Sequence, residues 1–310
     1  MSFLKTKDLL DLTELSPEEI YKILSLASEL KAEGKNSLRQ DLSGKSVGLI
    51  FNKPSTRTRV SFQVGVSQLG GNSIYLQSGD LQIGRGESLA DTARVLSGYL
   101  DALVVRTYAH QEAMELAKGA SIPVINALTD LHHPCQALAD LMTINESKSY
   151  LKGLKLAYLG DGNNVCHSLM VAAEKVGIDI SVATPAGFEP DESVIARRPQ
   201  ADVAISNDPK KAVQGADVLY TDVWVSMGQE EEAKERLEKF KPFQLNKELL
   251  ALAKPDAIAM HCLPAHPGQE ITEEVMQGSQ SVIFTQAENR LHSQKALLIG
   301  LMGNEDEDKL

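Results

Sequence analysis

The sequence has few cysteines and no long apolar run. Its three cysteines, Cys135, Cys166 and Cys262, are odd in number and far apart. This argues against a framework of disulfides and for a reducing compartment. No stretch of about 18 apolar residues could span a membrane, and charged residues follow Met1–Lys5 where a signal peptide would have its apolar core. We therefore expect a cytoplasmic protein with no membrane partner.

Positive charge is also scarce. The chain has 31 Lys and Arg residues against 42 Asp and Glu residues, for a net charge of −11 at pH 7. Such a surface repels the phosphate backbone of nucleic acids, so no nucleic-acid partner is expected. An anionic ligand would have to be bound by a local cluster of basic residues.

The length exceeds that of one ordinary core. At about 150 residues per domain, the 310 residues predict two domains. Hydrophobic residues make up 43% and charged residues 24% of the chain, which is typical of a globular enzyme. We find no internal repeat and no low-complexity linker, so the two domains should pack closely.

Apolar runs alternate with helical patterns in both halves of the chain. In a chain of this kind, the alternation predicts parallel sheets with right-handed crossovers. The expected strands are 47–51, 72–76, 102–105 and 123–126 in the first half, and 156–159, 180–183, 203–205, 218–221 and 258–260 in the second. Helical patterns cover about 17–31, 57–69, 88–99 and 110–118, begin again at His133, and return at about 287–302.

The predicted fold class is therefore α/β, with two domains that are each a parallel sheet flanked by helices. The first domain is predicted at 1–147 with the C-terminal helix of about 287–303, and the second at 148–286. Residues 304–310 form an acidic tail. Ligands of open parallel sheets bind at the carboxyl ends of the strands, so we expect the active site in the cleft between the domains.

The segment Phe51–Arg59 is a strand-to-helix turn that suits an oxyanion. Ser55 is a good N-cap, and the free N–H groups of the first helical turn, two hydroxyls and two guanidinium groups, those of Arg57 and Arg59, should converge on one point. Arginines in a first turn oppose the helix dipole, which favours a bound phosphate over a solvated surface helix. Arg106 ends a neighbouring strand and should aim at the same place.

Gly160–Val165 partly matches a dinucleotide-binding fingerprint. The third glycine is replaced by Val165, and the next strand ends in Ala183-Thr184-Pro185 with no acidic residue for a ribose. We expect no dinucleotide cofactor. The segment predicts a tight turn that presents Asn163 or Asn164 to a polar ligand, with Gly162 making it flexible.

Cysteine and histidine gather in His132–Cys135 and His261–His266. Their spacing fits no zinc finger, ribbon or metalloprotease motif, so we expect no metal. Cys262 follows a buried strand and is either a small buried hydrophobe or a thiol that touches substrate. Asp222 follows another strand, where it either anchors a substrate ammonium or forms a turn.

Taken together, these motifs resemble the transcarbamoylase family over essentially the whole chain. The Ser-Met-Gly and His-Cys-Leu-Pro segments are similar to those of the ornithine-specific members. The matching segments, in the order of the family, are Ser55–Arg59, Arg106-Thr107, His133–Gln136, Asp222–Gly228 and His261–Pro264.

The resemblance implies transfer of a carbamoyl group from carbamoyl phosphate to the δ-amino group of L-ornithine, which gives L-citrulline and phosphate. It implies a carbamoyl phosphate domain followed by an ornithine domain, and a homotrimer or an assembly of trimers whose active sites are shared between subunits. This chemistry needs an uncharged amine, stabilisation of an oxyanion and departure of phosphate, so we expect neither a metal nor a redox cofactor.

The resemblance also implies roles for individual residues. Catalytic roles fall to Arg57, Arg106, His133, Asp222 and Cys262. Carbamoyl phosphate would be bound by Ser55, Thr56, Arg57, Thr58, Arg106, His133 and Gln136, by Gln82 reaching in from a neighbouring subunit, and by Cys262, Leu263 and Arg290. Ornithine would be held by Asn164, Asp222, Ser226 and Met227.

Several alternatives stay open at the level of sequence. The amine could be putrescine, acetylornithine or aspartate, and a sensor of a phosphorylated metabolite could share the architecture. Cys262 could act as a base or only orient the substrate. The sequence does not distinguish arginine biosynthesis from degradation, nor a trimer from a larger assembly.

Overall fold

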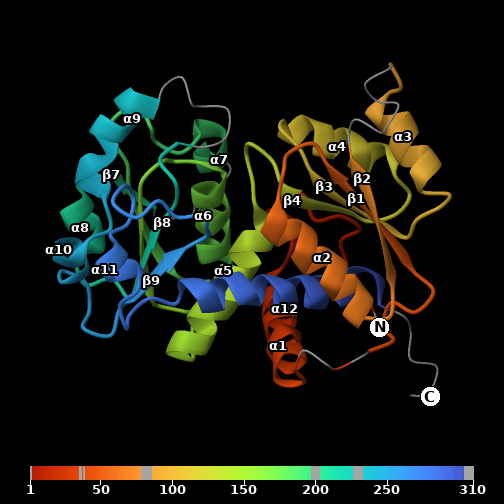
Figure 1. Cartoon of the computed structure of the whole chain (residues 1–310), viewed down its shortest axis with the longest axis horizontal. Coiled ribbons are helices and arrows are strands. Elements are labelled where there is room, and N and C mark those ends of the chain that lie inside the picture. Colours follow the sequence, from red (N-terminus) through yellow and green to blue (C-terminus); the bar gives the residue numbers. More distant parts are fainter. Residues whose placement is uncertain are drawn as a thin grey trace. The chain divides into compact units, whose positions relative to one another are not determined.

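The chain folds into two compact α/β units. The computed structural model describes residues 2–34, 37, 39–77, 86–196, 203–225 and 233–303, so the predicted acidic tail lies outside the described residues. Unit 1 comprises Met1–Met142 and Glu288–Leu310, and unit 2 comprises Thr143–Ala287. The chain passes from one unit to the other within two helices, α5 (Pro134–Lys148) and α12 (Ile283–Met302) (Figure 1).

Unit 1 is built on a four-stranded parallel sheet in the order β2-β1-β3-β4. Its strands are β1 (Ser46–Phe51), β2 (Asn72–Gln77), β3 (Ala102–Arg106) and β4 (Val124–Leu128). The four strands predicted in the first half of the chain are thereby confirmed within one or two residues. They form because short apolar runs of β-branched and leucine residues, bounded by turns, bury both faces of a central strand.

Helices cover both faces of this sheet. They are α1 (Pro17–Ala32), α2 (Thr56–Gln68), α3 (Leu89–Leu96) and α4 (His110–Gly119), with the short 3-10 turn η1 (Leu12–Glu14). The helices α3 and α4 pack side by side on one face, where Ile50, Leu103 and Val105 contribute to a buried cluster (Figure 1). The predicted capping box of α1 is present, since Ser16 and Glu19 each accept the other's backbone N–H, at 3.2 and 2.8 Å.

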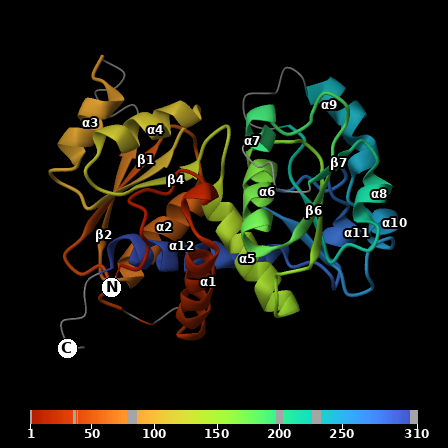
Figure 2. The same cartoon turned by 180° about the vertical axis from the view of Figure 1, so that it is seen from behind.

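Unit 2 is a five-stranded parallel sheet in the order β7-β6-β5-β8-β9 (Figure 2). Its strands are β5 (Lys155–Leu159), β6 (Asp179–Ala183), β7 (Ala204–Ser206), β8 (Val218–Thr221) and β9 (Ile258–His261). Its helices are α6 (Asn164–Val176), α7 (Glu192–Ala196), α8 (Pro209–Val213), α9 (Ala233–Phe240), α10 (Lys247–Leu250) and α11 (Glu273–Met276), with η5 (Lys241–Phe243). The predicted α/β class with two parallel sheets is confirmed.

Each sheet changes its direction of growth at one point. The chain adds β2 to one side of β1 and β3 to the other, and it adds β6 to one side of β5 and β8 to the other. The strand ends are level there, because Phe51 pairs with Arg106 and Leu159 pairs with Thr221. Loops diverge at such a switch point and leave room for a ligand. The motifs predicted from the sequence, where the structure describes them, follow the carboxyl ends of these strands or lie on helices beside those ends.

Among the described residues, no helix is both long and apolar enough to cross a membrane.

Candidate active site

The turn between β1 and α2 forms the first part of the candidate site. Ser55 is the N-cap of α2, and its hydroxyl accepts the backbone N–H of Thr58 at 3.3 Å. The side chains of Thr56 and Arg57 are exposed, whereas that of Thr58 is buried. The first turn of α2 therefore presents backbone N–H groups and a guanidinium at the carboxyl end of β1, as the sequence predicts.

The prediction that Arg59 joins this cluster is wrong. Its guanidinium lies over the ring of Tyr75 on β2, 3.7 Å from the ring centroid, and its Nε donates to Gln63 at 3.2 Å. Residues two apart on a helix point to different sides of it. Arg57 and Arg59 consequently have different surroundings, and only Arg57 remains available to a ligand at the helix start.

Arg106 brings a buried positive charge to the same strand ends. Its side chain is 8% exposed, and no described residue accepts a hydrogen bond from its Nε. Burial, together with the charges of Arg290 and Arg57, lowers the pKa of Arg106 to about 10. The guanidinium is still protonated at neutral pH, so like charges are concentrated here.

Arg290 on α12 connects two other predicted residues, Gln136 and Thr58. Its Nη1 donates to Gln136 Oε1 at 2.6 Å, and its Nη2 donates to Thr58 Oγ1 at 3.0 Å. Gln136 in turn donates to Asp140 at 2.8 Å, which fixes the amide so that its oxygen faces Arg290. Hydrogen bonds thus join Thr58, Gln136 and Arg290, which are far apart in the sequence, inside unit 1.

His133 precedes α5 and is buried among these cations. Burial lowers its pKa well below the ordinary value, and the charges of Arg290, Arg106 and Arg57 act in the same direction. The imidazole is therefore neutral at physiological pH. A neutral histidine can donate one hydrogen bond without adding to the positive charge.

Lys53, which the sequence analysis did not select, adds to the positive charge. Its pKa is lowered by burial and by the charge of Arg106, while Asp130 and Glu112 partly offset this. Its ammonium lies 4.3 Å from the centroid of the Tyr108 ring. Its position in the turn between Phe51 and Ser55, which was predicted to bind an anion, could have identified it from the sequence.

Unit 2 brings Asp222 and Cys262 together, as predicted. The carboxylate follows β8 and is 6% exposed. Its Oδ1 accepts the Cys262 thiol at 2.9 Å and the backbone N–H of Val223 at 2.8 Å, and its Oδ2 accepts Nδ2 of Asn163 at 2.8 Å. In this geometry the thiol donates a hydrogen bond to the carboxylate.

The sequence pattern offers Asn163 or Asn164 to a polar ligand, and the resemblance implies Asn164, whereas it is Asn163 that contacts Asp222. Asn163 is the N-cap of α6, and its Oδ1 accepts the N–H groups of Val165 and Cys166 at 3.0 and 3.1 Å. Because these bonds orient the amide, its nitrogen faces Asp222. A helix cap placed directly after a strand was the signal. Asn164 is partly exposed and opens α6, and its ligand role stays a prediction.

A buried ion pair that no sequence pattern indicates holds the loops after β5 and β8. Arg236 of α9 pairs with Asp161, and its Nε donates to the backbone oxygen of Trp224 at 2.7 Å. Burial raises the pKa of Asp161 to about 6, although the charge of Arg236 opposes this. The partner lies 75 residues away in sequence, which explains why it was missed.

Gly162 does not make its turn flexible, contrary to the prediction. A Cβ atom at this position would lie 2.3 Å from the backbone nitrogen of Pro190 and 2.4 Å from the carbonyl carbon of Glu189. The N–H of Gly162 also donates to the oxygen of Phe188 at 2.9 Å. Glycine is required because another backbone segment packs directly against the turn.

His261, the last residue of β9, fixes the segment that follows this strand. The buried imidazole lies 3.1 Å from Glu270 through Nε2, and its Nδ1 accepts the N–H of Leu263 at 2.9 Å. Leu263 has a φ of +60°, in the left-handed region that only a few non-glycine residues adopt. The hydrogen bond to His261 helps to hold this conformation. The Cys262 side chain, which lies between these two residues, is partly exposed.

Three predicted site residues, Gln82, Ser226 and Met227, lie outside the described residues, and their roles stay predictions. The others fall into two groups. Within unit 1 lie Ser55, Thr56, Arg57, Thr58, Arg106, His133, Gln136 and Arg290, and within unit 2 lie Asn164, Asp222, Cys262 and Leu263.

Comparison with known proteins assigns the two parts of the chain to one family. Residues 7–146 match the carbamoyl-P binding domain of aspartate/ornithine carbamoyltransferase, and residues 152–301 match the Asp/Orn binding domain. The chain belongs to the aspartate/ornithine carbamoyltransferase family. The resemblance seen in the sequence motifs is thereby confirmed.

Individual carbamoyltransferases are similar over nearly the full length. Ornithine carbamoyltransferase of Anoxybacillus flavithermus is 58% identical over 306 residues, which cover 96% of this chain and 98% of the relative. That of Pyrococcus abyssi is 55% identical, with 97% of each chain covered. The solved ornithine carbamoyltransferase of Pyrococcus furiosus superposes with a TM-score of 0.92 at 53% identity, covering 97% of this chain and 99% of the other.

The close packing at Gly162 predicts a loss of stability in Gly162→Ala. The methyl group would overlap backbone atoms, which typically costs about 1–3 kcal/mol of unfolding free energy. We expect a lower midpoint in thermal unfolding followed by calorimetry. The matched control is Gly98→Ala, whose nearest neighbouring atom would lie 3.3 Å from the new Cβ. Equal midpoints for the two variants would contradict the role assigned to Gly162.

The exposure of the three cysteines predicts selective alkylation. Cys135 and Cys166 are buried and Cys262 is partly exposed, and burial raises the pKa of Cys135 to about 12. The reactive form is the thiolate, so native protein treated with iodoacetamide should take up one label per chain, at Cys262, as read by peptide mass spectrometry. The Cys262→Ser variant should take up none. Labelling of Cys135 at a comparable rate would refute this description.

Proposed function

We propose that this protein transfers the carbamoyl group of carbamoyl phosphate to the δ-amino group of L-ornithine, giving L-citrulline and phosphate. The observation that carries the proposal is the concentration of arginine charge around the start of α2 and the neutral His133, in the part of the chain that matches a carbamoyl-P binding domain. Relatives more than half identical to this chain are named ornithine carbamoyltransferase.

Carbamoyl phosphate has a dianionic end and a polarised carbonyl, and the residues of unit 1 suit both. The N–H groups of α2, Arg57 and Arg106 neutralise the phosphate, which becomes the leaving group. Thr58, Arg106 and His133 donate to the carbonyl oxygen, where negative charge develops. Because the Thr58 oxygen already accepts from Arg290, its own proton is directed to another acceptor. Gln136 and Arg290 hold this arrangement in place.

Ornithine is proposed to bind to the residues of unit 2. Asp222 and Cys262 receive its amine groups, together with Asn164, Ser226 and Met227, and Leu263 lines the reacting centre. The uncharged δ-nitrogen attacks the carbonyl carbon, so a C–N bond forms and the bond from that carbon to the phosphate oxygen breaks. Phosphate departs with the bonding electrons. The proton released by the nitrogen passes to the departing phosphate, since Cys262 could accept it only as a thiolate.

The hydrogen bond from Cys262 to Asp222 supports an orienting role for the thiol. A protonated thiol that donates to a carboxylate is not poised to take a proton. It can keep the carboxylate aligned for an ammonium group. We therefore favour the departing phosphate as the proton acceptor.

The chemistry requires the two groups of residues to form one site. The carbonyl carbon and the attacking nitrogen must come within bonding distance, so we propose an active site in the cleft between a carbamoyl phosphate domain and an ornithine domain, with closure around the substrates. We further propose a homotrimer or an assembly of trimers, in which Gln82 of one subunit completes the site of its neighbour, and a cytoplasmic location.

The assignment predicts citrulline formation by the purified protein and a strong effect of Arg57→Ala. Loss of one preorganised donor typically lowers the rate by about a hundredfold or more. A colorimetric citrulline assay with carbamoyl phosphate measures this, and Arg94→Ala, which removes an exposed arginine of α3, is the control and should keep the parent rate. No product with ornithine would refute the activity, and turnover of putrescine, acetylornithine or aspartate instead would change the substrate.

A second variant tests the role of the thiol. If Cys262 orients Asp222, Cys262→Ser should keep kcat within about tenfold and raise the KM for ornithine, because serine preserves a donor to the carboxylate. Steady-state kinetics at saturating carbamoyl phosphate separates the two constants. A loss of kcat of about a thousandfold with an unchanged KM would instead assign Cys262 as an obligatory base.

A further inference from the structure

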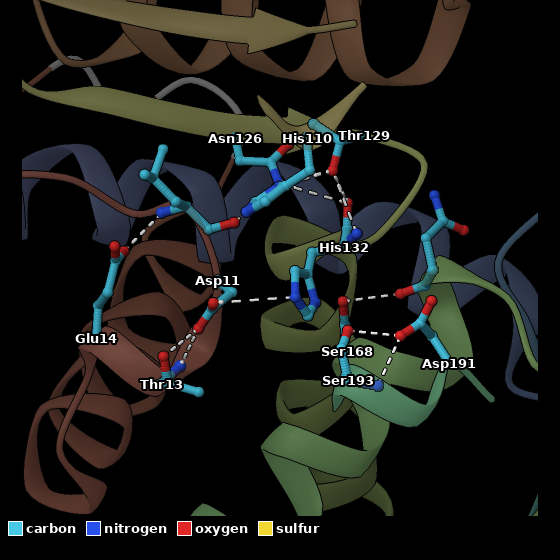
Figure 3. Close-up of polar contacts among 12 residues, drawn as sticks. Asp11, Thr13, Glu14, His110, Asn126, Thr129, His132, Ser168, Asp191 and Ser193 are labelled. Carbon is cyan, nitrogen blue, oxygen red and sulfur yellow. Dashed lines mark hydrogen bonds and ion pairs between the residues drawn. The ribbon is translucent and has the colours of Figure 1, made fainter. Parts of the chain in front are cut away.

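A group of metal-ligating side chains lies in unit 1, apart from the residues assigned to the proposed reaction. Asp11 is the N-cap of η1, His110 is the first residue of α4, and His132 lies between β4 and α5. One ligand atom from each of the three lies within 4.8 Å of the others. Figure 3 shows the three side chains approaching one another from separate segments of the chain.

The Asp11 carboxylate is already oriented for such a role. Its Oδ1 accepts the N–H of Thr13 at 2.6 Å, and it also accepts the Thr13 hydroxyl. Its Oδ2 lies 3.9 Å from Nε2 of His132. One oxygen therefore holds the turn while the other faces the imidazole (Figure 3).

The two histidines are arranged so that their ring nitrogens can share a ligand. Their ring centroids are 5.1 Å apart, with an angle of 74° between the rings. Nδ1 of His110 lies 3.0 Å from the hydroxyl of Thr129, and that hydroxyl lies 3.3 Å from the carbonyl oxygen of His132. In the tautomer of His110 that donates from Nδ1 to Thr129, Nε2 is the nitrogen that can bind a metal ion. Metal-bound histidines usually make such a bond with their second nitrogen.

The surroundings are negative, and two of the three side chains are largely shielded from water. His132 is 3% exposed and Asp11 is 9% exposed. The carboxylate of Glu14 lies close enough to Asp11 and Asp8 for their negative charges to act on it. A divalent cation would offset the repulsion among these carboxylates.

We propose that Asp11, His110 and His132 form a binding site for a divalent transition metal ion such as Zn²⁺. Two imidazole nitrogens and one carboxylate oxygen, with water in the fourth position, are a donor set that Zn²⁺ and Co²⁺ accept. Bonds of about 2.0 Å place tetrahedral ligands about 3.3 Å apart, so ligand atoms that now lie within 4.8 Å of each other need only a small contraction. The ion would tie the N-terminal segment, α4 and the loop that carries His133 to one another.

Co²⁺ is a suitable probe because its absorption reports the ligands. The group Asp222, His261 and Cys262 also has ligand atoms within 4.8 Å of one another, so the full-length Cys262→Ser variant is the background. We expect it to bind one Co²⁺ per chain with visible d–d bands and no thiolate-to-cobalt charge-transfer band, and to unfold at a higher temperature with the metal than without it.

His110→Gln in this background is the decisive variant, because His110 is partly exposed and its loss should be tolerated by the fold. Loss of an outer-shell partner alone weakens metal binding by about 10- to 100-fold, so loss of a ligand should weaken Co²⁺ affinity by at least about tenfold and abolish the thermal shift. Without metal, the Cys262→Ser protein and its His110→Gln derivative should unfold at similar temperatures.

His266→Gln is the matched control, since His266 is also accessible, at 51% exposed, but lies outside the group. It should bind Co²⁺ as the background does. Asp11→Asn repeats the test with a variant that keeps the helix cap, and it decides the matter if His110→Gln does not fold. Absence of Co²⁺ binding by the Cys262→Ser protein at millimolar metal, or equal affinity in His110→Gln and its background, would overturn the proposal.

Discussion

The burial of positive charge at the carboxyl ends of β1 and β3 is the constraint on which unit 1 depends. The pKa of Arg106 is about 10 against an ordinary 12.5, which corresponds to about 3 kcal/mol of unfavourable free energy in the charged form. The same charges, with burial, keep His133 neutral. The fold tolerates this arrangement because Arg290 is held by Thr58 and Gln136. A bound dianion, as in the proposed substrate, would offset this positive charge.

In unit 2 the buried charge at the candidate site is carried by a carboxylate. The buried carboxylate of Asp222 receives hydrogen bonds from a thiol, an amide and a backbone N–H. The buried pair of Asp161 and Arg236 fixes the loops around it. Such neutralised and hydrogen-bonded carboxylates are costly to disturb once a partner is lost. The pattern suits recognition of an amine, as the cluster of arginines in unit 1 suits recognition of a phosphate.

The sequence predicted the two sheets and most of the candidate site residues for a local reason. Apolar runs such as Val47–Phe51 set the strands, and residues directly after a strand in a parallel sheet must lie at its carboxyl edge. That rule located Ser55, Arg106, Asp222 and Cys262. The rule could not place Arg59, because the guanidinium of Arg59 packs on the ring of Tyr75 in strand β2. A helical pattern in the sequence does not reveal such a contact with a strand.

The sequence by itself determined the α/β class, the strand ends and the chemical types that gather there, because these follow from local periodicity and from short motifs. Only the tertiary structure decided which groups touch. It joined Arg290 to Thr58 across 232 residues, paired Asp161 with Arg236, and brought Asp11, His110 and His132 together. It also showed that Gly162 is required by the backbone of Glu189 and Pro190. Such contacts depend on packing between segments distant in sequence, where charge, burial and space are set jointly and leave no local pattern.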